Sequence, residues 1–207
     1  MPSRAKERSR NNSITLVVQG AASRLSSTGD APLHAALDML RAVDRISREE
    51  EPRIGGVIDI GIGIHRGLTI LGLVGAQDRL EPTVISDAVN VASRLERLTR
   101  VYGARIIVSA SAMAPESSFR SRARLLGHQS VRGKSGSVEC YEVFAADSPV
   151  LQLHKEHSRP AFEQAVHLLR DECWGEAMRS FQAILDRCPS DLAARELAEV
   201  ARRGRPA

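Results

Sequence analysis

The feature that most constrains this fold is an amphipathic segment in the middle of the chain, from Ser86 to Tyr102. Its apolar residues recur every three or four positions, which is the spacing of one buried helix face. Ser86 or Asp87 is suited to cap the first turn, and Gly103 is suited to end the last. The pattern predicts a helix whose inner stripe is formed by Ala88, Val91, Ala92, Leu95, Leu98 and Tyr102.

Segments rich in β-branched residues lie on both sides of this helix. The segment from Gly56 to Gly75 alternates apolar and small residues, which predicts two strands joined by a tight turn at Gly67. The polar stretch 76–83, which contains Pro82, is expected to be a loop. Further strands are predicted at 14–18, 106–108 and 125–143, the last as a pair around a turn at 133–136.

Helical spacing recurs near both ends of the chain. It covers 31–46, and the charged stretch 47–55 after it is expected to be a connection. The composition changes near 147–149, and helices are predicted at about 158–170, 174–187 and 190–203, with a break at Pro189. We therefore divide the chain into a flexible basic lead-in (1–12), a domain (13–147) and a helical tail (148–207). The tail's spacing of Gly175, Ala177, Phe181 and Pro189 resembles a single tetratricopeptide unit.

The composition is that of a globular protein: 43% of the 207 residues are apolar and 26% are charged. Aromatic residues make up only 3%, too few for the stacking platforms that bind single-stranded nucleic acid, so no nucleic-acid partner is expected. No apolar run approaches the roughly 20 residues of a membrane span. The three cysteines form no Cys-x-x-Cys pair, which argues against a disulfide framework or zinc site and favours a reducing, cytoplasmic location.

Two polar residues on the predicted central helix are candidates for chemistry. Asn90 and Arg94 are four positions apart and therefore share a face, which lies away from the apolar stripe. Arginine offers a planar fork of donors to a phosphate, and asparagine both donates and accepts hydrogen bonds. The pair suits an anion attached to a ribose, and the net charge of +4 is compatible with a nucleotide. A solvated polar helix face is the alternative.

Several sequence patterns between Ile62 and Val143 together resemble one family. They are Ile-Gly-Ile-His-Arg-Gly at 62–67, Thr-Val-Ile-Ser-Asp-Ala-Val-Asn-Val-Ala-Ser-Arg-Leu-Glu at 83–96, Tyr-Gly-Ala-Arg-Ile-Ile-Val-Ser at 102–109, and Val-Arg-Gly-Lys-Ser at 131–135. This combination resembles the C-terminal two-thirds of a class III adenylate/guanylate (nucleotidyl) cyclase domain. The resemblance implies an α+β fold with a ferredoxin-like core of antiparallel sheet and helices, incomplete at the N-terminus and followed by a small all-helical tail.

The resemblance also assigns roles to individual residues. It gives Asn90 the orientation of the ribose and Arg94 the stabilisation of charge on the transferring phosphoryl group. Thr83 falls at the purine-selecting position and is more similar to adenylate than to guanylate cyclases; a plain β-branched strand end is the alternative. Lys134 matches a phosphate-binding lysine, although an ordinary turn lysine looks the same and Arg132 could take its place.

Other conspicuous residues receive structural interpretations. His65 lies at a predicted strand end, and the family carries histidine there without a catalytic role. Asp87 resembles the family's helix-capping acid and not a metal ligand. Gly61, Gly63 and Gly67 do not form a phosphate loop, because no Gly-Lys-Ser/Thr follows at the required spacing.

The carboxylates that hold Mg²⁺ or Mn²⁺ in this family have no counterpart in the sequence. One belongs to a Phe-x-Asp-Ile motif that is absent, and the other to a Gly-Asp hairpin, where Asn12 and Ser13 fall instead. Metal is thus expected for the family, with no ligands from this chain. The family's early purine-reading lysine also lacks a counterpart.

These observations predict a cyclase-domain protein that acts on ATP and forms cyclic AMP and pyrophosphate. We expect it to be inactive alone and to supply the ribose and transition-state half of a site shared in a homo- or heterodimer. A truncated gene product would have the same sequence. The alternative function is a catalytically dead interaction module, whose helical tail docks a protein partner.

Overall fold

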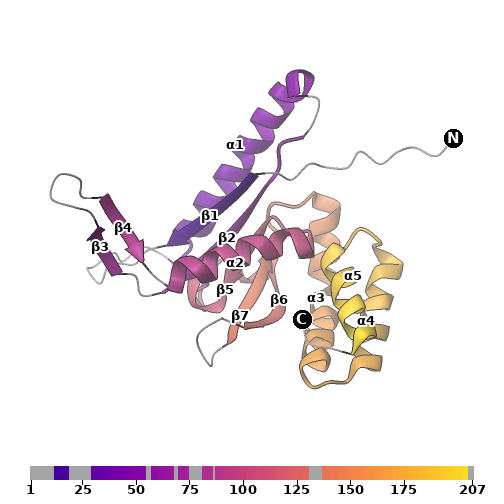
Figure 1. Cartoon of the computed structure of the whole chain (residues 1–207). Coiled ribbons are helices and arrows are strands. Elements are labelled where there is room, and N and C mark those ends of the chain that lie inside the picture. Colours follow the sequence, from indigo (N-terminus) through magenta and orange to yellow (C-terminus); the bar gives the residue numbers. More distant parts are fainter. Residues whose placement is uncertain are drawn as a thin grey trace.

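The computed structural model describes residues 12–18, 29–54, 57–67, 70–74, 81–85, 87–130 and 137–204 (Figure 1). They form an α+β fold, which confirms the predicted class. Five strands make the main sheet, in the spatial order β1-β2-β5-β7-β6. Their bounds are Asn12–Val18 (β1), Ile60–Arg66 (β2), Ile106–Ser109 (β5), Ser137–Val143 (β7) and Ala123–Ser130 (β6).

The sheet is mixed, whereas the resemblance implied an antiparallel one. β1 and β2 are parallel, and so are β2 and β5, while β7 runs antiparallel to both β5 and β6. The parallel pairs follow from the connections, because α1 (Ala31–Ile54) lies between β1 and β2, and α2 (Asp87–Tyr102) precedes β5. A helical crossover is what allows successive strands to run in the same direction.

β3 (Ile70–Val74) and β4 (Glu81–Ile85) form a separate antiparallel pair. The two strands predicted within 56–75 are confirmed as β2 and β3, although they belong to different sheets. The loop predicted at 76–83 is wrong at its end, because β4 begins at Glu81. Pro82 misled the prediction. It pairs opposite Leu73 in a two-stranded ribbon, where each strand has an open edge that tolerates the missing proline N–H.

α1 is longer than predicted and continues to Ile54, so 47–55 is not a connection over most of its length. The charged residues there lie on a helix surface, where Arg53 donates to Glu50 at 2.8 Å. Ser47 on the other side is buried, and its Oγ accepts a hydrogen bond from the Ile58 backbone N–H at 2.8 Å. The charge run was a solvated helix face.

The two helices α1 and α2 pack on opposite faces of the sheet. Ile106 and Val108 of β5 belong to the hydrophobic cluster that contains Leu33 and Leu40 of α1. Ile107, between them, points the other way and joins the cluster under α2. The alternation of side chains along a strand thus divides the core into two halves.

Two glycines of β2 let α2 lie unusually close to the sheet. A Cβ atom on Gly63 would lie 2.3 Å from the carbonyl oxygen of Ala92, and one on Gly61 would lie 1.9 Å from Oγ1 of Thr99. The Gly-x-Gly pattern therefore serves helix packing. The helix itself confirms the prediction for 86–102, and its first turn carries Asp87, whose charge favours the positive end of the helix dipole.

The C-terminal part forms three helices, α3 (Pro149–Arg170), α4 (Trp174–Arg187) and α5 (Leu192–Arg203). The second and third were predicted nearly as they are. α3 begins nine residues before its predicted start near 158, because Ser148 caps it there by accepting a hydrogen bond from the Leu151 N–H. The helix continues through Pro160. No helix among the described residues is long and apolar enough to cross a membrane.

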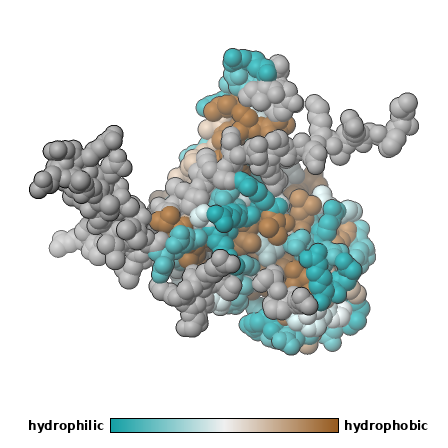
Figure 2. Space-filling model, in the orientation of Figure 1, coloured by the Kyte–Doolittle hydropathy of each residue, from teal (hydrophilic) through white to brown (hydrophobic). Residues whose placement is uncertain are grey.

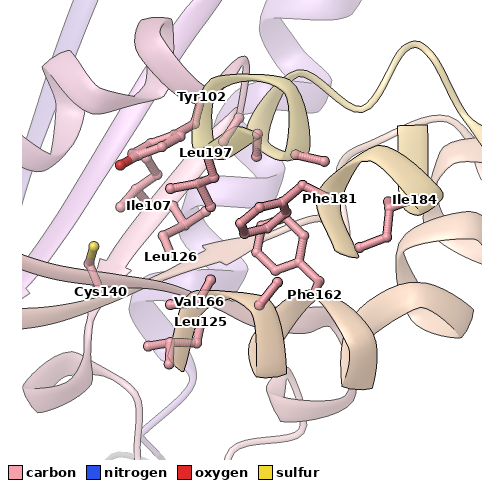
Figure 3. Close-up of a cluster of buried hydrophobic side chains, with 14 of the residues drawn as sticks. Tyr102, Ile107, Leu125, Leu126, Cys140, Phe162, Val166, Phe181, Ile184 and Leu197 are labelled. Atoms are coloured by element: carbon pink, nitrogen blue, oxygen red, sulfur yellow. The ribbon is translucent and has the colours of Figure 1, made fainter. Parts of the chain in front are cut away.

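The tail helices share a core with the sheet. Phe162, Phe181 and Leu197 pack with Tyr102 and Leu126 in one buried cluster (Figure 3). Residues on both sides of the predicted division at 147/148 thus belong to the same hydrophobic core. The two phenylalanine rings meet edge to face, with centroids 5.4 Å apart.

Buried charges also join the tail to the sheet. The fully buried Arg124 of β6 donates two hydrogen bonds of 2.7 Å to Asp191, the cap of α5, and one of 2.7 Å to Glu142 of β7. Lys155 of α3 donates to Glu142 and, at 2.6 Å, to Asp147. Burial would raise the pKa of Glu142, but the charges of Arg124 and Lys155 outweigh it and hold that pKa below its ordinary value.

Candidate functional site

The candidate site lies on the outward face of α2, which crosses the sheet in Figure 1. Asn90 and Arg94 are one turn apart and open onto a groove of about 650 Å³. Asn90 is exposed and Arg94 is partly buried. The structure thus brings together the two residues that the sequence predicted as catalytic.

The packing of the inner side of α2 on the sheet determines where Asn90 and Arg94 point. Val91 and Leu95 are buried in the cluster that α2 shares with the tail, and Ala92 rests on Gly63. Because helix side chains repeat every 3.6 residues, Asn90 and Arg94 must then point away from the sheet. Within the described part of the chain, their side chains form no hydrogen bond or ion pair, so both are available to bind a ligand.

The sequence analysis missed Arg97, which also lines the groove. It is three positions after Arg94 and exposed, so two guanidinium groups lie one turn apart on the same helix. The i, i+4, i+7 spacing of Asn90, Arg94 and Arg97 was visible in the sequence. Together the two arginines make this face attractive to a polyphosphate.

The structure describes only the backbone of one of the other two predicted binding residues and does not describe the second. Thr83 lies in β4 and pairs opposite Gly72, four residues before α2 begins, but its side chain is not described. Lys134, with its possible substitute Arg132, falls outside the described residues. The roles of Thr83 and Lys134 remain predictions.

His65 is held by serines that the sequence analysis did not connect with it. Its Nδ1 lies 2.8 Å from Oγ of Ser109 and 3.4 Å from Oγ of Ser111. Burial lowers the pKa of His65 and favours the neutral ring. Ser109 is completely buried, so a substrate cannot reach its hydroxyl as a nucleophile. This contact ties β2 to β5, as expected of a structural histidine.

Metal-binding carboxylates do not gather among the described residues: nowhere there do three His, Cys, Asp or Glu side chains come close enough to hold an ion. Asn12 and Ser13, which fall where the family carries a Gly-Asp pair, begin β1. The residues described on this chain do not fit the Mg²⁺ or Mn²⁺ that the family uses, and no step through a metal ion is assigned to them.

The family of this α+β domain, with its asparagine and arginine side by side on the central helix, follows from comparison with known proteins. A model of the adenylate and guanylate cyclase catalytic domain matches residues 16–145. This is more than half of the chain, which therefore belongs to that family.

Two of the relatives are adenylate cyclases. One from Anabaena cylindrica is 42% identical over 122 residues, which are 56% of this chain and 24% of that protein. The terminal-differentiation-specific adenylate cyclase of Dictyostelium discoideum is 33% identical over 163 residues, 76% of this chain and 7% of that protein. The chain spans a quarter or less of the length of these relatives. A solved bacterial light-regulated adenylyl cyclase aligns with 67% of this chain and 39% of its own, at 24% identity and a TM-score of 0.47.

Proposed function

We propose that this chain supplies one half of a shared adenylate cyclase site: the half that holds the ribose and stabilises the transition state. The observation that supports it is the pair of Asn90 and Arg94, held on the outer face of α2 by close packing beneath. The relatives named above, which are adenylate cyclases, favour ATP as the substrate.

The reaction joins the 3′ oxygen of ATP to its α-phosphorus and breaks the bond from that phosphorus to pyrophosphate, while the 3′ hydroxyl loses its proton. Negative charge shifts toward the leaving oxygens as the bond breaks. Arg94 is placed to stabilise this charge, and Asn90 to hold the ribose so that its hydroxyl meets phosphorus in line. Thr83 would select adenine, and Lys134 would bind phosphate.

In this proposal a second cyclase domain completes the site. The described residues offer no set of metal-binding carboxylates, and the sequence has no Phe-x-Asp-Ile motif. The activating carboxylates therefore come from the partner in this proposal, and Asn90 and Arg94 come from this chain. A homodimer of the chain would repeat the same half twice.

The first prediction concerns the chain alone. We expect no formation of cyclic AMP when the purified chain is incubated with ATP and either Mg²⁺ or Mn²⁺, because the metal-binding half is missing. Product formation is followed by chromatography of the nucleotides. Robust turnover that remains after removal of any contaminating cyclase would refute the half-site assignment.

The second prediction is complementation. A cyclase domain that keeps its metal aspartates but has lost its own asparagine and arginine should regain activity when mixed with this chain. Arg94→Ala should lower kcat in the mixture by about 10²–10³, the usual cost of a lost transition-state contact. Asn90→Ala should also lower the rate by misplacing the ribose hydroxyl.

Arg100→Ala is the matched control, because Arg100 lies on the same helix but pairs with Glu96 outside the groove. It should complement as well as the wild-type chain. If the two proteins associate by sedimentation and the mixture is inactive, the catalytically inert interaction module is the better description. If Arg94→Ala complements fully, the role of Arg94 is wrong.

A further inference from the structure

A second cavity lies where the sheet and the end of α2 meet the tail helices. It occupies about 220 Å³ between β6, the last turn of α2 and the helices α3 and α5, and Trp174 lies at its margin. None of the residues proposed for cyclase chemistry lines it. Figure 2 shows hydrophobic residues reaching the surface between α2 and the tail helices.

A backbone irregularity in β6 accompanies this space. The pairing register of β6 with β7 shifts between Leu125 and Gly127, and Gly127 has a φ of 113°, a conformation that other residues avoid. A Cβ atom at Gly127 would already lie 3.7 Å from Cγ1 of Val166 on α3. The β6 bulge and the lack of a side chain at Gly127 leave space beside α3, which a regular strand with a larger residue there would occupy.

The size of the cavity limits what it can hold. An engineered cavity of about 150 Å³ is large enough for benzene, whereas sites for drug-sized ligands begin at about 300 Å³. A volume of about 220 Å³ therefore suits one or two fused rings.

The walls define the chemistry of the occupant. Leu126, Val166 and Leu197 are buried and apolar, and with Tyr102 they converge in Figure 3. The polar groups on the inner wall are the Tyr102 hydroxyl and the side-chain amide of Gln129, which hydrogen-bond to each other. The other titratable side chains of the lining are exposed and lie toward the opening: His128, His167, Arg170 and Glu172. The inner wall therefore favours an uncharged aromatic body with one hydrogen-bonding group, because a charge buried against that wall would find no charged partner there.

We propose that this cavity is a regulatory binding site for a small, uncharged aromatic compound of the size of indole. Binding would tie Tyr102, the last residue of α2, to the tail helices, and α2 carries Asn90 and Arg94. An effect on cyclase activity rests on the function proposed above, whereas binding itself does not.

The chain contains its own reporter for the test. Trp174 is its only tryptophan and lines the cavity. In a ¹⁵N-labelled sample, the single indole N–H signal belongs to Trp174. Unlabelled indole can therefore be added as the ligand without contributing a signal of its own. We expect a saturable shift of that signal, with a Kd of about 0.1–1 mM for a ligand of this size.

Two neighbouring leucines of α3 provide a matched pair of variants. Leu169 lines the cavity, whereas Leu168 packs against the same hydrophobic cluster outside it. Leu169→Phe should fill the space and raise the Kd for indole at least tenfold, while Leu168→Phe should leave it within about twofold. If Leu169→Phe unfolds, Val200→Phe fills the same cavity from α5.

Two results would overturn the proposal: no saturable shift up to about 5 mM indole, or equal weakening by Leu168→Phe and Leu169→Phe. Binding without any change in a complementing mixture would retain the site and remove only its regulatory role. Because the titration needs no turnover, its outcome is independent of whether the half-site function is correct.

Discussion

The buried side chain of Asp191 makes two kinds of stabilising contact. It caps α5 by accepting a hydrogen bond of 3.1 Å from the Ala194 N–H, and it binds Arg124 in a bidentate pair. Burial would raise the pKa of Asp191, but its hydrogen bonds and attraction to Arg124 prevail and lower it. Asp191→Asn keeps a good cap and removes the charge, so we expect a loss of about 3 kcal/mol in the free energy of unfolding at neutral pH.

The pH dependence follows from the direction of this shift. A carboxyl whose folded pKa is depressed stabilises the fold above its unfolded pKa, about 3.9, and that stabilisation is lost as the pH falls through the folded pKa. The difference in stability between wild type and Asp191→Asn should therefore be constant near neutrality and shrink below about pH 4. Urea unfolding at several pH values measures it. Asp186→Asn, on the exposed surface of α4, is the control, and an equal loss there would contradict the explanation.

At the residue scale, sequence could find the outward pair but not the buried network. Asn90 and Arg94 were recognisable because they share one helix, so their proximity needs only the helical repeat. Arg124, Glu142, Lys155 and Asp191 come from four elements, and no local spacing brings them together. His65 with Ser109 is a similar case, since they meet only because β2 and β5 are neighbours in the sheet.

At the element scale, the position of α2 depends on the two glycines beneath it. Gly63→Ala places a Cβ atom 2.3 Å from backbone atoms of Ala92 and Glu96, and neither can move without the whole helix. We expect a loss of about 2–3 kcal/mol in stability, as for other forced overpacking. Gly175→Ala on α4 meets only the end of Arg179 at 3.7 Å and should be neutral or stabilise by up to about 1 kcal/mol. Thermal or urea denaturation compares the two, and equal effects would contradict this role of Gly63.

Elements with a regular hydrophobic pattern were predicted well, whereas those with mixed signals were not. α2, α4 and α5 have a clear helical period, β5 is a short continuous apolar run, and the predicted bounds of all four agree closely with the structure. α1 was cut short by a charged run, α3 was started near 158 although Ser148 caps an earlier start, and β4 was missed because of Pro82. Each error came from a local signal that tertiary context overrides, through a solvated helix face, a capped helix start or an open strand edge.

At the scale of the whole molecule, the tail is expected to be part of the folding unit and not an appendage. α3 begins at Pro149, one residue after the predicted start of the tail, and the cluster around Phe162 and Phe181 is continuous with Tyr102 and Leu126. Cutting the chain there would expose this surface and leave Arg124 without Asp191. Breaking a buried ion pair alone costs about 3–5 kcal/mol, a large part of the stability of an ordinary domain.

We therefore predict that a chain ending at Ser148 is insoluble or lacks a cooperative unfolding transition, and that co-expression of 149–207 as a separate fragment restores both. The full chain carrying Arg195→Ala is the control, because Arg195 is exposed on α5 and lies outside the buried cluster. Circular dichroism during heating and the dispersion of amide NMR signals provide the measurement. A truncated chain that melts cooperatively at the temperature of the full chain would show that the tail is dispensable. In that case the sheet and α2 must hold Asn90 and Arg94 in place without support from α5.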